Sequence, residues 1–230
     1  MSDQFDAGQV DEGQVDAGHV RQAGQFPARR PRADAERNRA RLLDAAVRAF
    51  SREDDAEVTL EAIARDAGVG IGTLYRHFPT REALVEAAYR SELARLCDAV
   101  PGLLAELPPD QATRAWMDLF VDYMTTKRGM AGALRAVIAA GGNPYAHSRD
   151  ALLTAIGTLL DAAAAAGTLR GDIAPADVLA GLSGVSLTAG DPAQRDQARR
   201  LLDLLMDGLR YQPEITAPRP AVIPGVPVSG

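Results

Sequence analysis

Residues 59–84, TLEAIARDAGVGIGTLYRHFPTREAL, constrain the fold more than any other part of the chain. They predict a short helix, a turn at Gly68, a second short helix and the start of a third, with Thr59 and Thr80 as N-caps. Small residues stand where two helix backbones must approach closely. Hydroxyl, aromatic and basic side chains share one face of the second helix. This combination is typical of a helix-turn-helix that enters the major groove of DNA.

The second of these short helices, over about 70–76, has an inner and an outer side. Leu74 and Phe78 are expected to anchor it inward. The glycines at 70 and 72 allow the start of the helix to approach a phosphate, and the hydroxyl and guanidinium groups can donate to phosphate or guanine. The residues expected on or near the outer surface are Gly70, Ile71, Thr73, Tyr75, Arg76 and His77. Packing stays an alternative for Tyr75, and capping of the helix end for His77.

Charge is distributed unevenly along the chain. The formal net charge of −6 argues against a nucleic-acid partner only superficially. Residues 1–28 hold five acids and one arginine, whereas residues 29–41 hold six arginines against Asp34 and Glu36. This basic cluster adjoins the motif, where phosphate contacts are needed. It is interpreted either as a DNA-binding arm or as an ordinary solvated surface.

The composition excludes several classes of protein. Cys97 is the one cysteine, so no intrachain disulfide can form, and no basic or resolving partner marks it as a redox sensor. No signal peptide and no apolar run of about 20 residues is present, which favours the cytoplasm and no membrane contact. Catalytic motifs and Cys/His clusters are missing, so no enzyme, metal site or cofactor is predicted. Lys127 is the one lysine among 25 basic residues.

The periodicity is helical almost throughout, so we expect an all-α fold. A helix over about 33–52 precedes the motif, and the helix after Thr80 is expected to end near Ala99 because Pro101 follows. Further helices are expected near 110–127, 129–140, 148–167, 175–189 and 192–211. We divide the chain into a disordered leader with a basic end (1–32), a helix-turn-helix domain (33–80), a larger ligand-binding and dimerisation domain (81–211) and a disordered Pro-rich tail (212–230).

The stretch AGVGIGTLYRHFPTREAL resembles the signature of the TetR family of bacterial transcriptional regulators, from about Arg37 to Tyr89. Residues 105–210, with AWMDLFVDYMTTKRGM, are similar to the SbtR-like C-terminal domain. The resemblance implies a homodimer, one recognition helix per subunit in successive major grooves, and an effector pocket in the C-terminal body. By position, it implies phosphate contacts from Thr59, Tyr75, His77 and Arg81, and base or backbone contacts from Gly70, Ile71 and Thr73.

Three departures from the family pattern reduce the expected direct readout of bases, and one of them is that the recognition helix has few long polar side chains. Gly70 stands where serine is common, and residues 53–57 form an acidic connection without the usual glycine. Arg76, the arginines of 29–41 and DNA shape are therefore expected to supply more of the specificity.

The C-terminal body suggests a pocket and an interface. Candidate pocket residues are Trp116, Phe120, Tyr123, Met124, Met130, Arg135 and His147, with core packing as the alternative. The last two helices are more apolar than one protomer requires, which favours a four-helix interface across a two-fold axis. The residues expected there are Gly181, Leu182, Gly184, Val185, Leu201, Leu202, Leu205 and Leu209. An intramolecular core is the alternative.

Together these features predict a ligand-responsive, dimeric transcriptional regulator, a repressor that a small molecule releases from a palindromic double-stranded DNA operator. The competing hypothesis is an all-α ligand-binding or protein-interaction module that has lost DNA binding. A third alternative is a regulator that activates transcription rather than represses it.

Overall fold

The computed structural model describes residues 31–51, 58–188 and 192–210, without the side chains of 31, 32, 192 and 193. These ranges form α-helices, and the one β-type pairing among them is an isolated bridge between Leu169 and Arg210. The expected all-α class is confirmed. The helices are α1 (Pro31–Phe50), α2 (Leu60–Asp66), α3 (Ile71–His77), α4 (Arg81–Glu106), α5 (Pro109–Gly129), α6 (Ala131–Ala139), α7 (Ser148–Ala165), α8 (Pro175–Ser186) and α9 (Pro192–Leu209).

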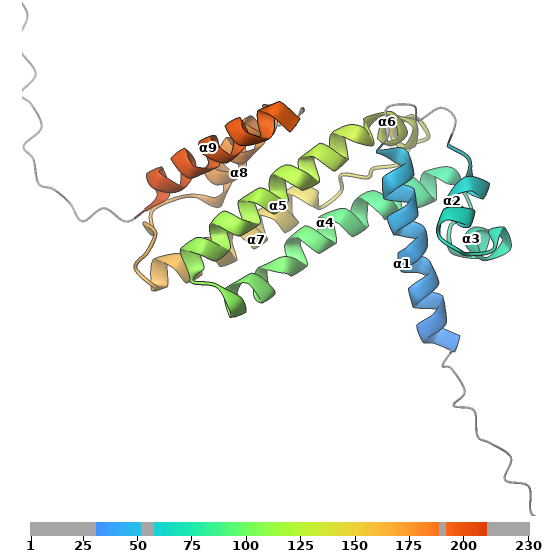
Figure 1. Cartoon of the computed structure of the whole chain (residues 1–230), viewed down its shortest axis with the longest axis horizontal. Helices are drawn as coiled ribbons and strands as arrows, with labels where there is room; N and C mark the ends of the chain where they lie inside the picture. Colours follow the sequence, from blue (N-terminus) through green and yellow to red (C-terminus); the bar gives the residue numbers. More distant parts are fainter. Residues whose placement is uncertain (1–30, 52–57, 189–191, 211–230) are drawn as a thin grey trace, which may run out of the picture.

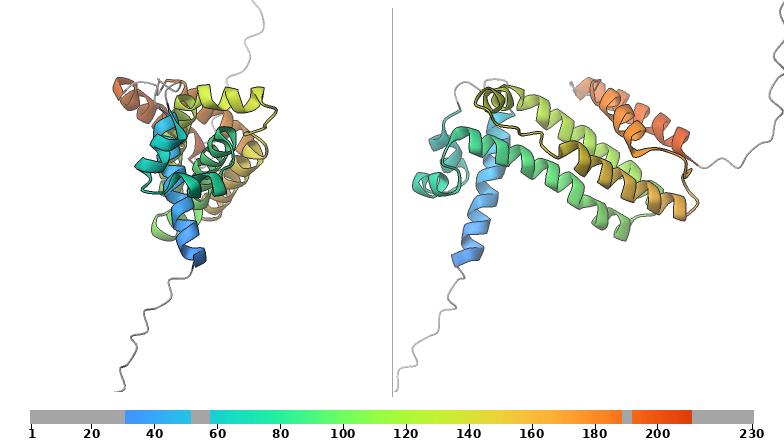
Figure 2. Two further views of the ribbon diagram at one scale, coloured as in Figure 1. Left: turned by 90° about the vertical axis from the view of Figure 1, so that its right-hand side faces the viewer. Right: turned by 180° about the vertical axis from the view of Figure 1, so that it is seen from behind.

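Helices α1, α2 and α3 form a head at one end of the molecule (Figure 1). The long helix α4 begins in this head, packs against α1 and continues along α5 into the body. Seen from behind, α8 and α9 lie at the other end, against α5 (Figure 2). Helix α4 is therefore the direct connection between the head and the rest of the molecule.

The head has the turns and caps that its sequence predicts. The Thr59 side chain accepts a hydrogen bond from the backbone N–H of Ala62, and the Thr80 side chain accepts one from Ala83, each at 3.1 Å. Gly68 follows α2 with a φ of +64°, a left-handed conformation that glycine adopts without strain. These local features set the angle between α2 and α3. The head core is buried beneath them and includes Leu42, Ala46, Phe50, Ile63, Leu74, Phe78 and Leu84.

The expected end of α4 near Ala99 is wrong, because the helix continues through Pro101 to Glu106. A proline inside a helix lacks an N–H and crowds the preceding turn. Here packing outweighs that cost: Val100 is buried, and Leu103 and Leu104 pack against the core. The Trp116 indole N–H of α5 also donates to the carbonyl of Leu96, at 2.9 Å, in the turn before the proline.

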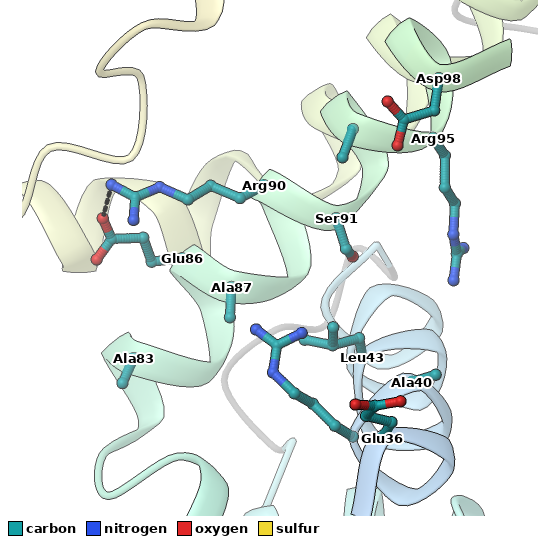
Figure 3. A pocket seen from close by; sticks show the side chains of 12 residues that line it. Glu36, Ala40, Leu43, Ala83, Glu86, Ala87, Arg90, Ser91, Arg95 and Asp98 are labelled. Carbon is teal, nitrogen blue, oxygen red and sulfur yellow. Dashed lines mark ion pairs between the residues drawn. The ribbon is translucent and has the colours of Figure 1, made fainter. Parts of the chain in front are cut away.

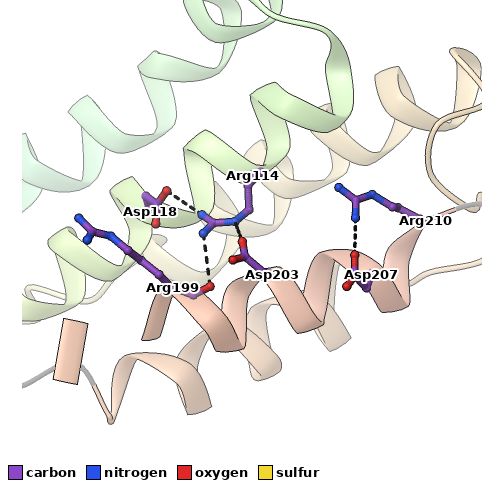
Figure 4. Close-up of polar contacts among 6 residues, drawn as sticks. All are labelled: Arg114, Asp118, Arg199, Asp203, Asp207 and Arg210. Carbon is purple, nitrogen blue, oxygen red and sulfur yellow. Dashed lines mark hydrogen bonds and ion pairs between the residues drawn. The ribbon is translucent and has the colours of Figure 1, made fainter. Parts of the chain in front are cut away.

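Helix α9 is held on α5 by apolar contacts and by surface charges. Ala198, Leu202, Met206 and Leu209 are buried on its inner side. Arg114 of α5 bonds both Asp118, at 2.6 Å, and Asp203 of α9, at 2.8 Å (Figure 4). Exposed ion pairs contribute only about 0–1 kcal/mol each, so the buried side chains supply most of the attachment.

Several predictions concern residues outside the described ranges. The leader up to residue 30, the acidic connection at 53–57 and the Pro-rich tail lie outside them. Residues 31 and 32, assigned to the leader, already belong to α1. Within the described ranges, no helix has the length and apolar character to cross a membrane.

Candidate functional site

The outer face of α3 is exposed to solvent, and its inner face is buried. Leu74 is fully buried and Phe78 is 3% exposed, as expected for the inward anchors. On the other side, Tyr75 is 46% exposed and Ile71 37%, and Arg76 and the glycines at 70 and 72 are exposed as well. Thr73 and His77 are half-buried at the edges of this face. The helix thus presents a hydroxyl, a guanidinium and a slim backbone to the outside.

Two other candidate DNA contacts have structural partners in the head. The Thr59 side chain caps α2 but is exposed. The Arg81 guanidinium donates to the carbonyl of Val58 and lies 4.6 Å from the centroid of the Phe50 ring. Sequence reasoning gave Arg81 no such role. Its contacts join the start of α4 to the end of α1 and to the residue before Thr59.

The arginines that precede the motif are only partly within the described residues. Arg37, Arg39 and Arg41 on α1 are exposed or nearly so. Arg37 pairs with Asp34, and the Arg39 guanidinium lies 5.6 Å from the centroid of the Phe78 ring. The positive charge of Arg39 therefore lies next to the C-terminal end of α3.

A pocket of about 320 Å³ lies between α4, α5, α7 and α8. Of the seven predicted pocket residues, three line it: Phe120, Tyr123 and Met124. Trp116 and Met130 are buried in the core instead, and Arg135 and His147 do not line it. The lining residues that sequence reasoning missed are Tyr89, Lys127, Tyr145, Ser148, Arg149, Leu152, Ala176, Leu179, Ala180 and Ser183.

Three hydroxyl groups of lining residues form a chain in the pocket wall. The Tyr89 hydroxyl donates to Ser148 Oγ at 3.2 Å and lies 2.7 Å from the Tyr123 hydroxyl. Since Tyr89 has one hydrogen to donate, its oxygen accepts from Tyr123. Burial, together with the hydrogen bond to Tyr89, raises the pKa of Tyr123 far above its ordinary value of 10.0, so this phenol stays neutral.

Lys127 of α5 lines the pocket beside two aromatic rings. Its amine lies 4.5 Å from the ring centroid of Tyr145 and 5.9 Å from that of Tyr89. The two rings meet edge to face, with centroids 5.4 Å apart. Burial lowers the pKa of Lys127 below its ordinary value of 10.5. The ring faces attract the amine, so the cation is held by aromatic side chains.

A second and larger hollow, of about 600 Å³, lies between α1 and α4 (Figure 3). Acidic and basic side chains alternate on its wall, and Arg90 pairs with Glu86 there at 2.6 Å. Small-molecule sites are mostly apolar with a few directed polar groups. The pocket between α4, α5, α7 and α8 fits that description, whereas this hollow does not.

The residues expected at a dimer interface divide into two groups. Leu182, Leu202 and Leu209 are at most 4% exposed and belong to the core of the protomer, the alternative that the sequence left open. Gly181 faces Leu205, whose methyl carbons lie 3.6 Å from where a Cβ would stand. Gly184 is exposed, and Val185, Leu201 and Leu205 are half-buried. Leu187, 76% exposed, and Leu204, 68% exposed, are the large apolar side chains that α8, its C-terminal turn and α9 leave uncovered.

Comparison with known proteins extends the resemblance over most of the chain. Residues 42–88 match the bacterial regulatory proteins of the tetR family, and residues 108–211 match the SbtR-like transcriptional regulator C-terminal domain. The TetR transcriptional regulator SCO0520 from Streptomyces coelicolor is 62% identical, with a TM-score of 0.71 over 75% of this chain and 98% of that one. The chain belongs to the TetR family of bacterial transcriptional regulators.

Other TetR-family relatives agree with this assignment. The regulatory protein from Mycobacterium vanbaalenii is 36% identical, with a TM-score of 0.65 over 78% of this chain and 99% of that one. The HTH-type regulator SrpR of Pseudomonas putida is 35% identical over 92 residues, 40% of this chain and 43% of that protein. The chain thus spans less than half the length of SrpR. TetR regulators bind operator DNA as homodimers, respond to small-molecule effectors and are not enzymes.

Proposed function

We propose that this protein is a dimeric TetR-family repressor that binds a palindromic DNA operator through the outer face of α3. A small molecule in the pocket between α4, α5, α7 and α8 releases it. The observation that carries the proposal is the two-sided α3, with Leu74 and Phe78 buried and Tyr75 and Arg76 exposed. DNA is its target, so its compartment is the cytoplasm.

The contacts assigned to DNA follow from which side chains are exposed. Ile71 and the slim backbone at Gly70 and Gly72 suit close approach to base edges. The Tyr75 hydroxyl and the Arg76 guanidinium suit phosphate oxygens, and Arg76 can also pair with guanine. The other assigned contacts come from Thr59, Thr73, His77 and Arg81. Gly70 offers no side chain, so phosphate contacts and DNA shape carry much of the recognition.

Dimerisation through α8 and α9 is supported by the apolar surface that one protomer leaves uncovered. Leu204 on α9 and Leu187 beside the end of α8 are mostly exposed, with Leu201 and Leu205 half-buried. Pairing these helices across a two-fold axis forms a four-helix interface that removes leucine side chains from water. In the DNA-bound dimer, the two α3 helices lie about 34–36 Å apart, one turn of B-DNA.

A small molecule bound in the pocket between α4, α5, α7 and α8 can change the separation of the two α3 helices. Its wall includes Tyr89 of α4, the helix that begins in the head, and Leu179 of α8, a helix of the proposed interface. An effector that prefers one separation of these helices selects one separation of the two heads.

The test is binding of the full-length protein to the DNA upstream of its own gene, measured by fluorescence anisotropy at low and moderate salt. Arg76→Ala is expected to weaken binding, and Arg135→Ala, which removes an exposed arginine from α6, is expected to leave it unchanged. Absence of DNA binding by the wild-type dimer would instead support the module that has lost DNA binding.

A further inference from the structure

The pocket between α4, α5, α7 and α8 carries positive charge that its own wall does not neutralise. Lys127 and Arg149 line it, and none of the described residues that line it is acidic. Lys127 makes no ion pair within the described part of the chain. A cation withdrawn from water without a counter-ion costs free energy. A ligand that brings a negative charge recovers that cost.

Ser148 adds a directed hydrogen-bond donor at the same place. It is 8% exposed and its Oγ accepts from the Tyr89 hydroxyl, but its hydroxyl donates to no group among the described residues. Tyr89 in turn accepts from Tyr123, so the hydrogen that this chain of hydroxyls leaves unused is on Ser148 Oγ. A buried donor of this kind needs an acceptor.

Hydrogen-bond donors and apolar side chains share the lining of this pocket. The Lys127 amine and Ser148 Oγ both lie beside Tyr89. Ser148 is the first residue of α7, an 18-residue helix, so it stands at the positive end of the helix dipole, where Asp150 is the acidic residue of the first turn. The apolar lining includes Phe120, Met124, Leu152 and Leu179.

A cationic ligand does not fit this arrangement. The aromatic face that would attract one, the ring of Tyr145, already has the Lys127 amine 4.5 Å from its centroid. A neutral ligand can accept from the Ser148 hydroxyl but leaves the Lys127 ammonium without a counter-ion.

We propose that the effector is an amphipathic carboxylic acid whose carboxylate lies between Lys127 and Ser148 and whose apolar body packs on Phe120, Met124 and Leu179. Arg149 supplies a second cation at the same wall. This inference rests on the proposed function, since it names the chemistry of the molecule that releases the repressor. A carboxylate is acceptor-only, which matches a site that presents only donors to it.

The test compares ligands that differ only in charge. Octanoate, 4-phenylbutyrate, their neutral amides and octylamine are titrated into the full-length dimer by calorimetry at neutral pH. Each carboxylate is expected to bind about tenfold or more tightly than its amide, the difference typical of a charge-assisted hydrogen bond. Octylamine is expected not to bind.

Substitutions test which residue causes the preference for a carboxylate. Lys127→Met keeps the length of the side chain and should reduce the preference for carboxylate to about twofold or less. Lys127→Arg should retain it. Arg135→Met is the matched control, because it removes the same charge from an exposed residue that does not line the pocket and should leave the preference intact.

The single lysine provides a direct structural readout. Reductive methylation with ¹³C-formaldehyde labels Lys127 and the N-terminal amine alone. Octanoate should shift the Lys127 signal more than octanamide does at the same concentration. The inference would be overturned if amide and acid bound equally, or if no carboxylate bound at millimolar concentration. It would also be overturned if the preference for carboxylate survived in Lys127→Met, or if octanoate left the Lys127 signal unshifted. DNA binding by the ligand-free dimer is measured in parallel, and its loss refutes the proposed function instead.

Discussion

Gly129, the last residue of α5, lies directly against the backbone of Ser51 at the end of α1. A methyl group at Gly129 would stand 2.6 Å from the carbonyl oxygen of Ser51, far inside van der Waals contact. The two preceding residues have other partners: Lys127 lines the pocket, and the Arg128 guanidinium donates to the carbonyl of Ser186 at the end of α8. Three consecutive residues at the end of α5 thus contact the pocket, the proposed dimer helix and the head.

Replacing Gly129 with alanine should therefore disturb the joint between head and body. Overpacking of this kind typically costs about 1–3 kcal/mol of the free energy of unfolding. Urea denaturation measures the loss, and anisotropy should show weaker operator binding. Gly102→Ala is the matched control: Gly102 is exposed within α4, and no atom lies within 4 Å of the position that an added methyl group would take. The same substitution there should stabilise by about 0.5–1 kcal/mol. Two variants with equal stability would contradict the close contact at Ser51.

Two arginines of the head should differ in what their removal changes. Arg81 donates to Val58 and stacks on Phe50, so Arg81→Ala should lower the free energy of unfolding by about 1–3 kcal/mol. Arg76 is exposed, so Arg76→Ala should change stability by less than about 0.5 kcal/mol. Thermal and urea unfolding of both variants measure this difference.

Removal of Arg76 should weaken DNA binding without the loss of stability expected for Arg81→Ala. If each subunit loses one phosphate contact, the slope of log affinity against log salt should fall by about 1.8 per dimer. Anisotropy titrations over a range of salt concentrations measure this slope. An unchanged affinity and slope would show that Arg76 does not contact phosphate.

Exposed leucines on the proposed interface should control the oligomeric state. Leu204→Glu places a carboxylate where the partner helix is expected and should raise the dimer dissociation constant by about 100-fold or more. Leu204 is 68% exposed, so the fold of the protomer should survive. Ile138→Glu, at a 47% exposed residue of α6, is the control and should remain dimeric. Sedimentation velocity distinguishes these outcomes, and an intact Leu204→Glu dimer would place the interface elsewhere.

The half-buried amine of Lys127 should make stability depend on pH. Burial lowers the pKa of Lys127, so the folded chain binds this proton less tightly than the unfolded chain. The unfavourable contribution is complete at a pH below the folded-state pKa and disappears as the pH rises toward the ordinary value of 10.5. Wild type should therefore gain stability relative to Lys127→Met over this window. Urea titrations of both proteins at matched pH measure it, and a constant difference would contradict the shift.

The local structure of the head was predictable because its signals are local. Thr59 and Thr80 cap their helices, Gly68 adopts a positive φ, and Leu74 and Phe78 point inward, each as its sequence context indicates. The same reasoning failed at Pro101, where it weighed a local backbone cost without the packing of Val100 and Leu103 that outweighs it.

The pocket was predicted only in part because helical spacing does not show which neighbour a side chain meets. Phe120 and Trp116 are one helical turn apart on α5, yet Phe120 lines the pocket and Trp116 is buried against α4. Lys127 had one signal, its place as the single lysine of the chain, and that signal did not indicate a location.

The sequence by itself determined the all-α class, the helix-turn-helix and the residues on each side of α3, because caps, turns and periodicity act over a few residues. Only the tertiary structure decided that Lys127, Tyr89 and Ser148 meet in one pocket, that Arg81 is bound within the head, and that Leu182 and Leu202 belong to the protomer. Those outcomes depend on how α4, α5, α7, α8 and α9 pack, and contacts between residues far apart in the chain leave no periodic pattern in the sequence.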